Sequence, residues 1–90
     1  MVSKKVTVIN ESGLHARPAG MLVHIAQQCT SDITCTVEGR KINLRNILDV
    51  MKQHIPQGAV MEIQCEGSKE AEDLHTLTAA IENGFEDVIC

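Results

Sequence analysis

Aromatic residues are almost absent from this chain of 90 residues, in which Phe85 is the only one. Stacking of bases on aromatic side chains is therefore unavailable, and a net charge of −4 opposes general binding to nucleic acid. Apolar runs of membrane-spanning length and a signal-peptide core are missing as well. We therefore expect a single domain over residues 1–90 in the cytoplasm, without a nucleic-acid partner and without direct insertion into a membrane.

Paired cysteines are lacking too, because the four cysteines form no CxxC motif and have no spacing typical of metal ligands. Cys35 and Cys65 fall in segments where apolar and polar residues alternate, so we expect them to be small core residues. Cys90, at the end of the chain, is expected to be an exposed free thiol. Neither a metal site nor a disulfide framework is predicted.

Hydrophobic periodicity predicts four strands and three helices. The expected strands are residues 4–9, 32–37, 41–44 and 60–66. The expected helices are residues 16–28, a short helix capped by Asn46 that runs to about Gln53, and a last one capped by Ser68 that stops at Asn83-Gly84. The order β-α-β-β-α-β-α predicts an α+β fold, a two-layer sandwich with all helices on one face of the sheet.

Apolar residues at regular spacing define the faces that should be buried. On the helices these are Ala19, Leu22, Val23 and Ala26, then Ala71, Leu74, Leu77 and Ile81. On the strands, Val6 and Val8 share one face, and the last strand should turn Met61, Ile63 and Cys65 inward.

The segment 13–19, Gly-Leu-His-Ala-Arg-Pro-Ala, is the strongest functional signal. Pro18 is tolerated only in the first turn of a helix, so His15 must lie at or next to the helix cap. The unpaired amides of that first turn, the helix dipole and the Arg17 guanidinium together favour an anion. A histidine in such a place can act as the nucleophile that receives a phosphoryl group, although a histidine that merely ends a helix explains the same residues.

Charge is unevenly distributed along the chain, which bears on the same question. Residues 1–45 hold six basic and three acidic side chains, whereas residues 46–90 hold two basic and nine acidic ones. A basic half around His15 suits an anionic ligand or an acidic partner protein, but ordinary solvated surfaces also produce such asymmetry.

The chain resembles the histidine-containing phosphocarrier family HPr of the bacterial phosphoenolpyruvate-dependent phosphotransferase system. The resemblance covers essentially the whole chain and is carried by Asn10, Gly13, Leu14, His15, Ala16, Arg17, Pro18 and Ala19. It implies an open-faced β-sandwich with a four-stranded antiparallel sheet. It also implies that His15 accepts a phosphoryl group from enzyme I and passes it to enzyme IIA domains for sugar uptake. The chain would then be a carrier component with a covalent phosphoryl group and no cofactor, not a stand-alone enzyme.

The resemblance also implies roles for neighbouring residues. Arg17 would assist at the site, and the amides of Ala16 and Arg17 would bind phosphoryl oxygens. Ser12 either donates a hydrogen bond near the phosphoryl group or serves only the turn. A partner-docking surface would comprise Ile47, Leu48 and Met51 on the second helix with Gly20 and His24 on the first. Because a short helix cannot bury all its apolar residues, we expect Ile47 and Leu48 to be exposed, in a small interface on a monomer.

Asn46 and Asp49 depart from the family. Many members carry a regulatory serine where this chain has Asn46, and asparagine has no hydroxyl to phosphorylate. Asp49 stands where the family usually has a small residue, and we expect its charge to weaken docking to acidic partners or to select a different one. Two other functions stay open. The first is a regulatory paralogue that signals through His15, with transcriptional regulators among its partners. The second is a small-molecule-binding regulatory domain that is never phosphorylated.

Overall fold

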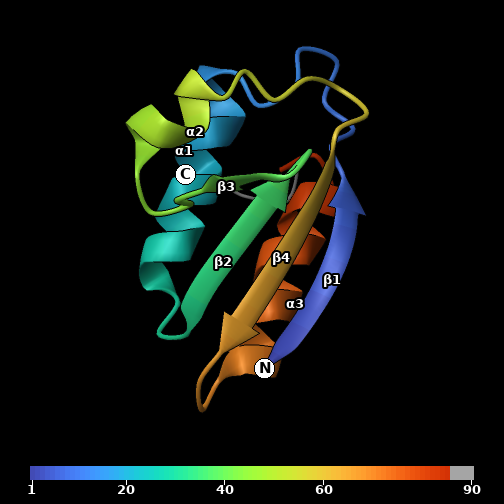
Figure 1. Cartoon of the computed structure of the whole chain (residues 1–90). Helices are drawn as coiled ribbons and strands as arrows, with labels where there is room; N and C mark the ends of the chain where they lie inside the picture. The colour runs from blue at the N-terminus through green and yellow to red at the C-terminus, as the bar shows by residue number, and fades with distance from the viewer. Residues whose placement is uncertain (86–90) are drawn as a thin grey trace.

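The structure is a computed structural model of the chain, and it describes residues 1–85. The described elements follow the predicted order: β1 (Val2–Thr7), α1 (Ala16–Gln28), β2 (Asp32–Val37), β3 (Arg40–Ile42), α2 (Ile47–Lys52), β4 (Val60–Glu66) and α3 (Glu70–Glu82). Figure 1 shows two layers, with the sheet in front and α1 and α3 behind it. Within the described part of the chain, no helix has the length and apolar character needed to cross a bilayer.

The strands form one antiparallel sheet in the order β1-β4-β2-β3. Strand β4 lies between β1 and β2, with Val6 opposite Met61 on one side and Val37 opposite Met61 on the other. Because side chains alternate along a strand, this register turns Met61, Ile63 and Cys65 toward the helices, and all three are fully buried. The α+β fold with an open-faced four-stranded sheet is therefore confirmed.

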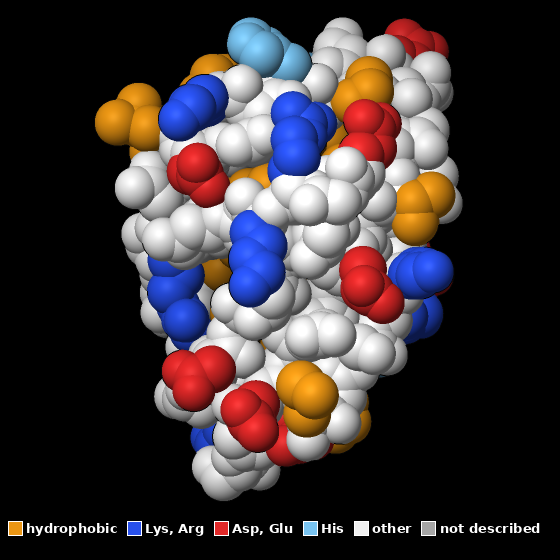
Figure 2. Space-filling model, in the orientation of Figure 1, with side chains coloured by type: hydrophobic (Ala, Val, Ile, Leu, Met, Phe, Trp, Pro, Cys, Tyr) orange, Lys and Arg blue, Asp and Glu red, His pale blue; other side chains and the backbone are white. Residues whose placement is uncertain are grey.

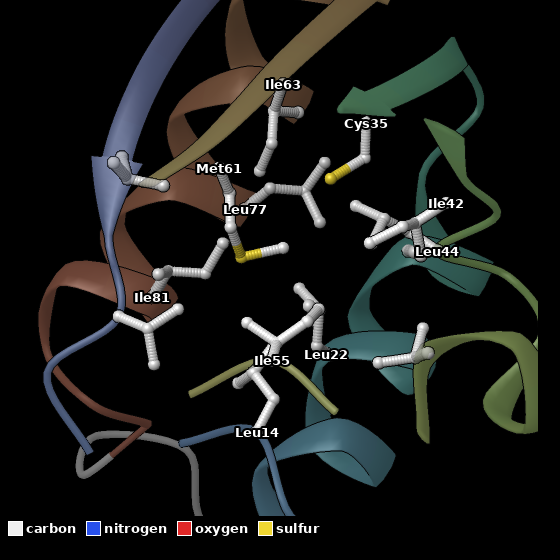
Figure 3. Packing of buried hydrophobic residues seen from close by; sticks show 14 of the residues in the cluster. Leu14, Leu22, Cys35, Ile42, Leu44, Ile55, Met61, Ile63, Leu77 and Ile81 are labelled. Carbon is white, nitrogen blue, oxygen red and sulfur yellow. The ribbon is translucent and has the colours of Figure 1, made fainter. Parts of the chain in front are cut away.

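The core lies between the sheet and the helices, and it is built almost entirely from aliphatic side chains. In Figure 3, Met61 and Ile63 of β4, Leu77 and Ile81 of α3 and Leu22 of α1 point toward a common centre. The predicted apolar stripe on α1 is buried over its whole length. The opposite face of the sheet, seen in Figure 2, carries charged and polar side chains with scattered hydrophobic ones, and has no helix over it.

Two strands end earlier than the sequence pattern predicts. Strand β1 covers Val2–Thr7 rather than 4–9, although Val8 is buried and its amide still donates to the Ala59 carbonyl at 2.9 Å. Strand β3 covers Arg40–Ile42 rather than 41–44. The chain leaves the ladder at Asn43, whose amide donates to Asp49 Oδ2 at 2.7 Å instead of to a neighbouring strand.

The start of α3 also differs from expectation. Its N-cap is Lys69, not Ser68, and Ala71 is exposed rather than buried. The helix begins one residue later than predicted, and the face toward the core includes Asp73 and Thr78 beside the predicted leucines and Ile81. Both polar side chains are hydrogen-bonded inside the protein, which a count of apolar residues cannot anticipate.

The cysteines are structural in the described residues, while Cys90 lies outside them. Cys35 and Cys65 are buried as predicted, and Cys29 is half-buried. Burial raises the pKa of the Cys35 thiol to about 12. Burial, reinforced by the negative charge of Asp73, raises the pKa of Cys29 to about 11. Since the thiolate is the reactive form, neither side chain is a nucleophile near neutral pH.

A buried hydrogen-bond network ties the end of α1 to the start of α3. Asp73 Oδ2 accepts from the Ser31 hydroxyl at 2.6 Å and from the Ser31 amide at 3.0 Å. Arg45 donates to the carbonyls of Ala26, Cys29 and Ser31 at 2.9–3.1 Å and so caps the C-terminal end of α1. Arg45 is therefore engaged in the fold rather than free for an anion.

Replacing Asp73 by alanine should lower the free energy of unfolding by about 2–4 kcal/mol at pH 7, because two buried donors of Ser31 lose a charged acceptor. The Ser31 hydroxyl bond chiefly lowers the pKa of Asp73 in the folded protein. The ionised Asp73 therefore stabilises the fold fully above the pKa that it has in the unfolded chain. This stabilisation is lost as the pH falls through the lower pKa that Asp73 has in the folded protein. Urea unfolding of both proteins from pH 7 to pH 2 measures this, with Ser31→Ala as control. A difference that stays constant below about pH 4 would contradict the assignment.

Candidate functional site

His15 is the N-cap residue of α1, as the position of Pro18 predicts. Its backbone is extended, with φ −75° and ψ −171°, and its carbonyl accepts the first intrahelical bond from the Ala19 amide at 3.0 Å. The imidazole makes no capping hydrogen bond, and the residue is exposed. The side chain is therefore held at a helix terminus but does not cap the helix, so its ring nitrogens are available for chemistry.

The helix behind His15 offers a positive end that the helix itself does not neutralise. Ala16 and Arg17 are its first two residues, and their amides precede the first i→i−4 bond. Pro18 is third and has no amide to leave unpaired, and the first turn contains no acidic side chain. With the exposed Arg17 guanidinium, the terminus forms a pre-built acceptor for an anionic group.

The loop before α1 fixes where His15 stands. Gly13 donates from its amide to the Asn10 carbonyl at 2.9 Å, which closes a turn. Leu14 donates to the Ile55 carbonyl at 2.9 Å, and its side chain is buried in the core. Since Leu14 is anchored inward by both backbone and side chain, the next residue is presented outward.

Two adjoining hollows meet at His15. One has a volume of about 340 Å³, and the residues that line it include Asn10, His15, Arg17, Met21, Gly84 and Phe85. The other, of about 460 Å³, brings Ser12 beside His15, together with Asn10 and Gly84. The structure thus gathers His15, Arg17 and Ser12, which the sequence singles out. Gly84, at the end of α3, also lines both hollows. The sequence predicts for Asn83-Gly84 only the end of a helix.

The exposure of the residues in the predicted docking surface is partly as expected. Leu48 is 76% exposed and Met51 39% exposed on α2, and Gly20 and His24 are exposed on α1. Ile47, expected to be exposed, is instead partly buried against the core. The two helices contact each other, and hydrophobic atoms project in Figure 2 where α2 lies in Figure 1. We call Leu48 and Met51 the α2 patch.

Asn46 and Asp49 both have clear local roles. The Asn46 side chain accepts from the amides of Leu48 at 3.0 Å and Asp49 at 3.2 Å, so the predicted cap is confirmed. Asp49 is half-buried, and its carboxylate accepts from the Asn43 amide at 2.7 Å. Its charge therefore fastens the loop before α2 as well as adding to the surface near the α2 patch.

Other candidate groups are not gathered into a site. His54 and His75 are exposed, and neither belongs to the hollows beside His15. Among residues 1–85, no group of three or more histidine, cysteine or acidic side chains is arranged to hold a metal ion. The chemistry of the described surface is therefore concentrated at the start of α1.

Comparisons with known proteins identify the family of the chain. A family model described as the PTS HPr component phosphorylation site matches residues 2–83. The HPr-C-His protein of Thermoanaerobacter tengcongensis is 31% identical, with a TM-score of 0.89 over 99% of this chain and 100% of that one. HPr of Bacillus anthracis is 35% identical over 89% of this chain and 95% of that one, with a TM-score of 0.83.

Another similar structure is Crh, a catabolite repression protein of Bacillus subtilis. It is 33% identical, and the match covers 93% of this chain and 97% of that one with a TM-score of 0.71. The family match spans nearly all the described residues, and the matching structures share both order and topology with this one. The chain therefore belongs to the HPr family, the phosphocarrier proteins of the phosphotransferase system.

Proposed function

We propose that His15 of this chain accepts a phosphoryl group from enzyme I, charged by phosphoenolpyruvate, and passes it to enzyme IIA domains for sugar uptake. The observation that carries the proposal is the exposed imidazole at the N-terminus of α1, which makes no capping hydrogen bond. It lies beside Arg17 and beside two first-turn amides that have no partner among residues 1–85. Family membership supplies the class of partner, which is the enzymes of the phosphotransferase system.

The chemical step needs little from this protein beyond position and charge. The lone pair of one ring nitrogen attacks phosphorus, the new N–P bond forms, and the bond from phosphorus to the donor breaks with its electrons going to the donor atom. The amides of Ala16 and Arg17 and the Arg17 guanidinium would bind the phosphoryl oxygens, and Ser12 adds a hydroxyl beside the same hollow. The group stays transferable because the site is an open hollow at the surface.

Incubation with enzyme I and radiolabelled phosphoenolpyruvate tests the proposal. We expect one phosphoryl group per chain, lost rapidly in acid and stable in base, as befits a phosphoramidate. Transfer of the label to an added IIA domain is expected to follow. A wild-type chain that takes no label, or takes one that survives acid, would refute the carrier function.

A regulatory output is the second candidate, and the likeness to Crh favours it. Asn46 lacks a hydroxyl, so phosphorylation at this position, which regulates many members of the family, is chemically impossible here. A purely regulatory paralogue would take label from enzyme I without delivering it to any IIA domain. An unphosphorylated small-molecule-binding domain would take none, so the same assay separates all three.

The α2 patch gives a prediction about docking. Replacing Leu48 by aspartate should slow transfer from enzyme I at least tenfold, because a charge then enters an apolar contact at the partner interface. The free energy of unfolding should change by less than about 0.5 kcal/mol, since the side chain is 76% exposed. Rates at limiting enzyme I measure the effect. The matched control is Thr76→Asp on the exposed side of α3, and equal rates for both variants would exclude docking through Leu48.

A further inference from the structure

The two polar atoms of the Asn10 side-chain amide differ in their hydrogen bonding. Its Nδ2 donates to the Gly84 carbonyl at 3.0 Å, which ties the loop before α1 to the end of α3. Its Oδ1 is buried and has no hydrogen-bond partner among residues 1–85. The bond to Gly84 fixes which end of the amide is the oxygen, because a flipped amide would place two carbonyl-type oxygens against each other.

A buried acceptor without a donor is unfavourable and rare, so it calls for an explanation. Asn10 lines both hollows that meet at His15. The other side chains of these hollows that can donate a hydrogen bond near neutral pH are Ser12, His15 and Arg17. The residue that carries the unpaired oxygen therefore lines the same small space as the reacting group.

We propose that Asn10 is a positioning residue, whose Oδ1 accepts the N–H of the His15 ring nitrogen that does not carry the phosphoryl group. The inference rests on the function proposed above. When one ring nitrogen forms the N–P bond, the other must hold a proton and the ring gains positive character. An acceptor on that N–H fixes the reactive tautomer and the ring orientation, as partner groups do for other catalytic histidines.

The chemistry favours His15 over the other donors as the partner of Asn10. In the proposed function the Arg17 guanidinium and the Ser12 hydroxyl face the phosphoryl oxygens, which leaves the His15 ring N–H as the donor for Asn10. A neutral amide also suits a carrier better than a carboxylate. It stabilises the ring N–H without adding a negative charge that would repel the incoming phosphoryl group.

The test compares two variants that separate the ends of the amide. Asn10→Ala removes both the tether to Gly84 and the acceptor, whereas Asn10→Asp removes the tether but keeps the acceptor. If Asn10→Ala does not fold, Asn10→Leu removes the same atoms with less loss of volume. The proteins are labelled with ¹⁵N-histidine and phosphorylated chemically with phosphoramidate, so that the readout does not depend on enzyme I.

In phosphorylated wild type and Asn10→Asp we expect a ring N–H of His15 that exchanges slowly with water, and we expect its loss in Asn10→Ala. Onward transfer to a IIA domain should fall about tenfold in Asn10→Ala, the effect of one hydrogen bond to a charged group, with less loss in Asn10→Asp. A protected N–H that persists in Asn10→Ala, or is absent from wild type, overturns the proposal. Loss of the protected N–H in both variants also does so, by assigning the effect to the tether. If enzyme I labels none of these proteins while the NMR pattern holds, only the proposed function fails.

Discussion

The His15→Ala protein is expected to take up no phosphoryl group from enzyme I under conditions that label every wild-type chain. Alanine keeps the backbone conformation of the N-cap but removes the ring nitrogen that attacks phosphorus. The first-turn amides and Arg17 remain, so the variant still offers an anion site without a nucleophile. The loss should therefore be complete rather than partial.

Stability should be almost unaffected by the same change. The imidazole is exposed and makes no capping hydrogen bond, so its removal is expected to change the free energy of unfolding by less than about 0.5 kcal/mol. Urea unfolding checks this and separates lost chemistry from lost folding.

The matched control for His15→Ala is His75→Ala. His75 is also exposed, but it lies on α3 away from the hollows that meet at His15. This control should label like wild type. Residual acid-labile label on His15→Ala would show that another histidine accepts the group, with His24 on α1 the first to examine.

The sequence predicts the architecture well because the hydrophobic periodicity of each element marks the face that packs against neighbouring elements. Residues 16–28, 32–37 and 60–66 are recovered at both ends, since each begins and ends where the periodicity does. The Asn46 cap is local chemistry and was predictable in the same way. The errors lie where a distant partner decides. Strand β3 ends before Asn43 because the Asn43 amide donates to the Asp49 carboxylate. Asp73 can be buried because its carboxylate accepts a hydrogen bond from Ser31, which is distant in the sequence.

In the candidate site, too, the local features are predictable from the sequence and the features that depend on distant residues are not. His15, Arg17 and Pro18 lie within one helical turn, so their arrangement is readable from spacing alone. The contribution of Gly84 is not, because it lies more than sixty residues away in the sequence and lines the site through the fold, where the bond from Asn10 holds it. Ile47 was misplaced for a related reason, since whether an apolar residue on a short helix is buried depends on how the helix is docked.

Gly13 is where a single added methyl group should cause the largest loss of stability. Its φ is +66°, and a Cβ built there would lie 2.1 Å from the Ile55 carbonyl oxygen and 2.8 Å from Pro56 Cα. That oxygen accepts the Leu14 amide, the bond that anchors the loop before His15. The obstacle is backbone rather than a flexible side chain, so relief requires the two loops to move apart.

We expect Gly13→Ala to lower the free energy of unfolding by about 3 kcal/mol or more. Left-handed backbone costs alanine about 1–2 kcal/mol, and a broken buried hydrogen bond adds about 1–3 kcal/mol. In a domain of this size, 3 kcal/mol corresponds to a fall in Tm of roughly 12–24 °C. Phosphoryl acceptance should fall as well at temperatures where the variant stays folded, because the displaced loop carries His15.

Gly39→Ala is the matched control, because it isolates backbone strain from the clash. Gly39 has φ +79°, but an added Cβ there meets no atom within 4 Å. Gly39→Ala should therefore lower the free energy of unfolding by only about 1–2 kcal/mol, the cost of alanine in a left-handed backbone conformation. Thermal unfolding of the two variants measures the difference, which belongs to the contact between Gly13 and the Ile55 carbonyl. Equal Tm values would show that the loop yields to the methyl group freely and does not hold His15 in place.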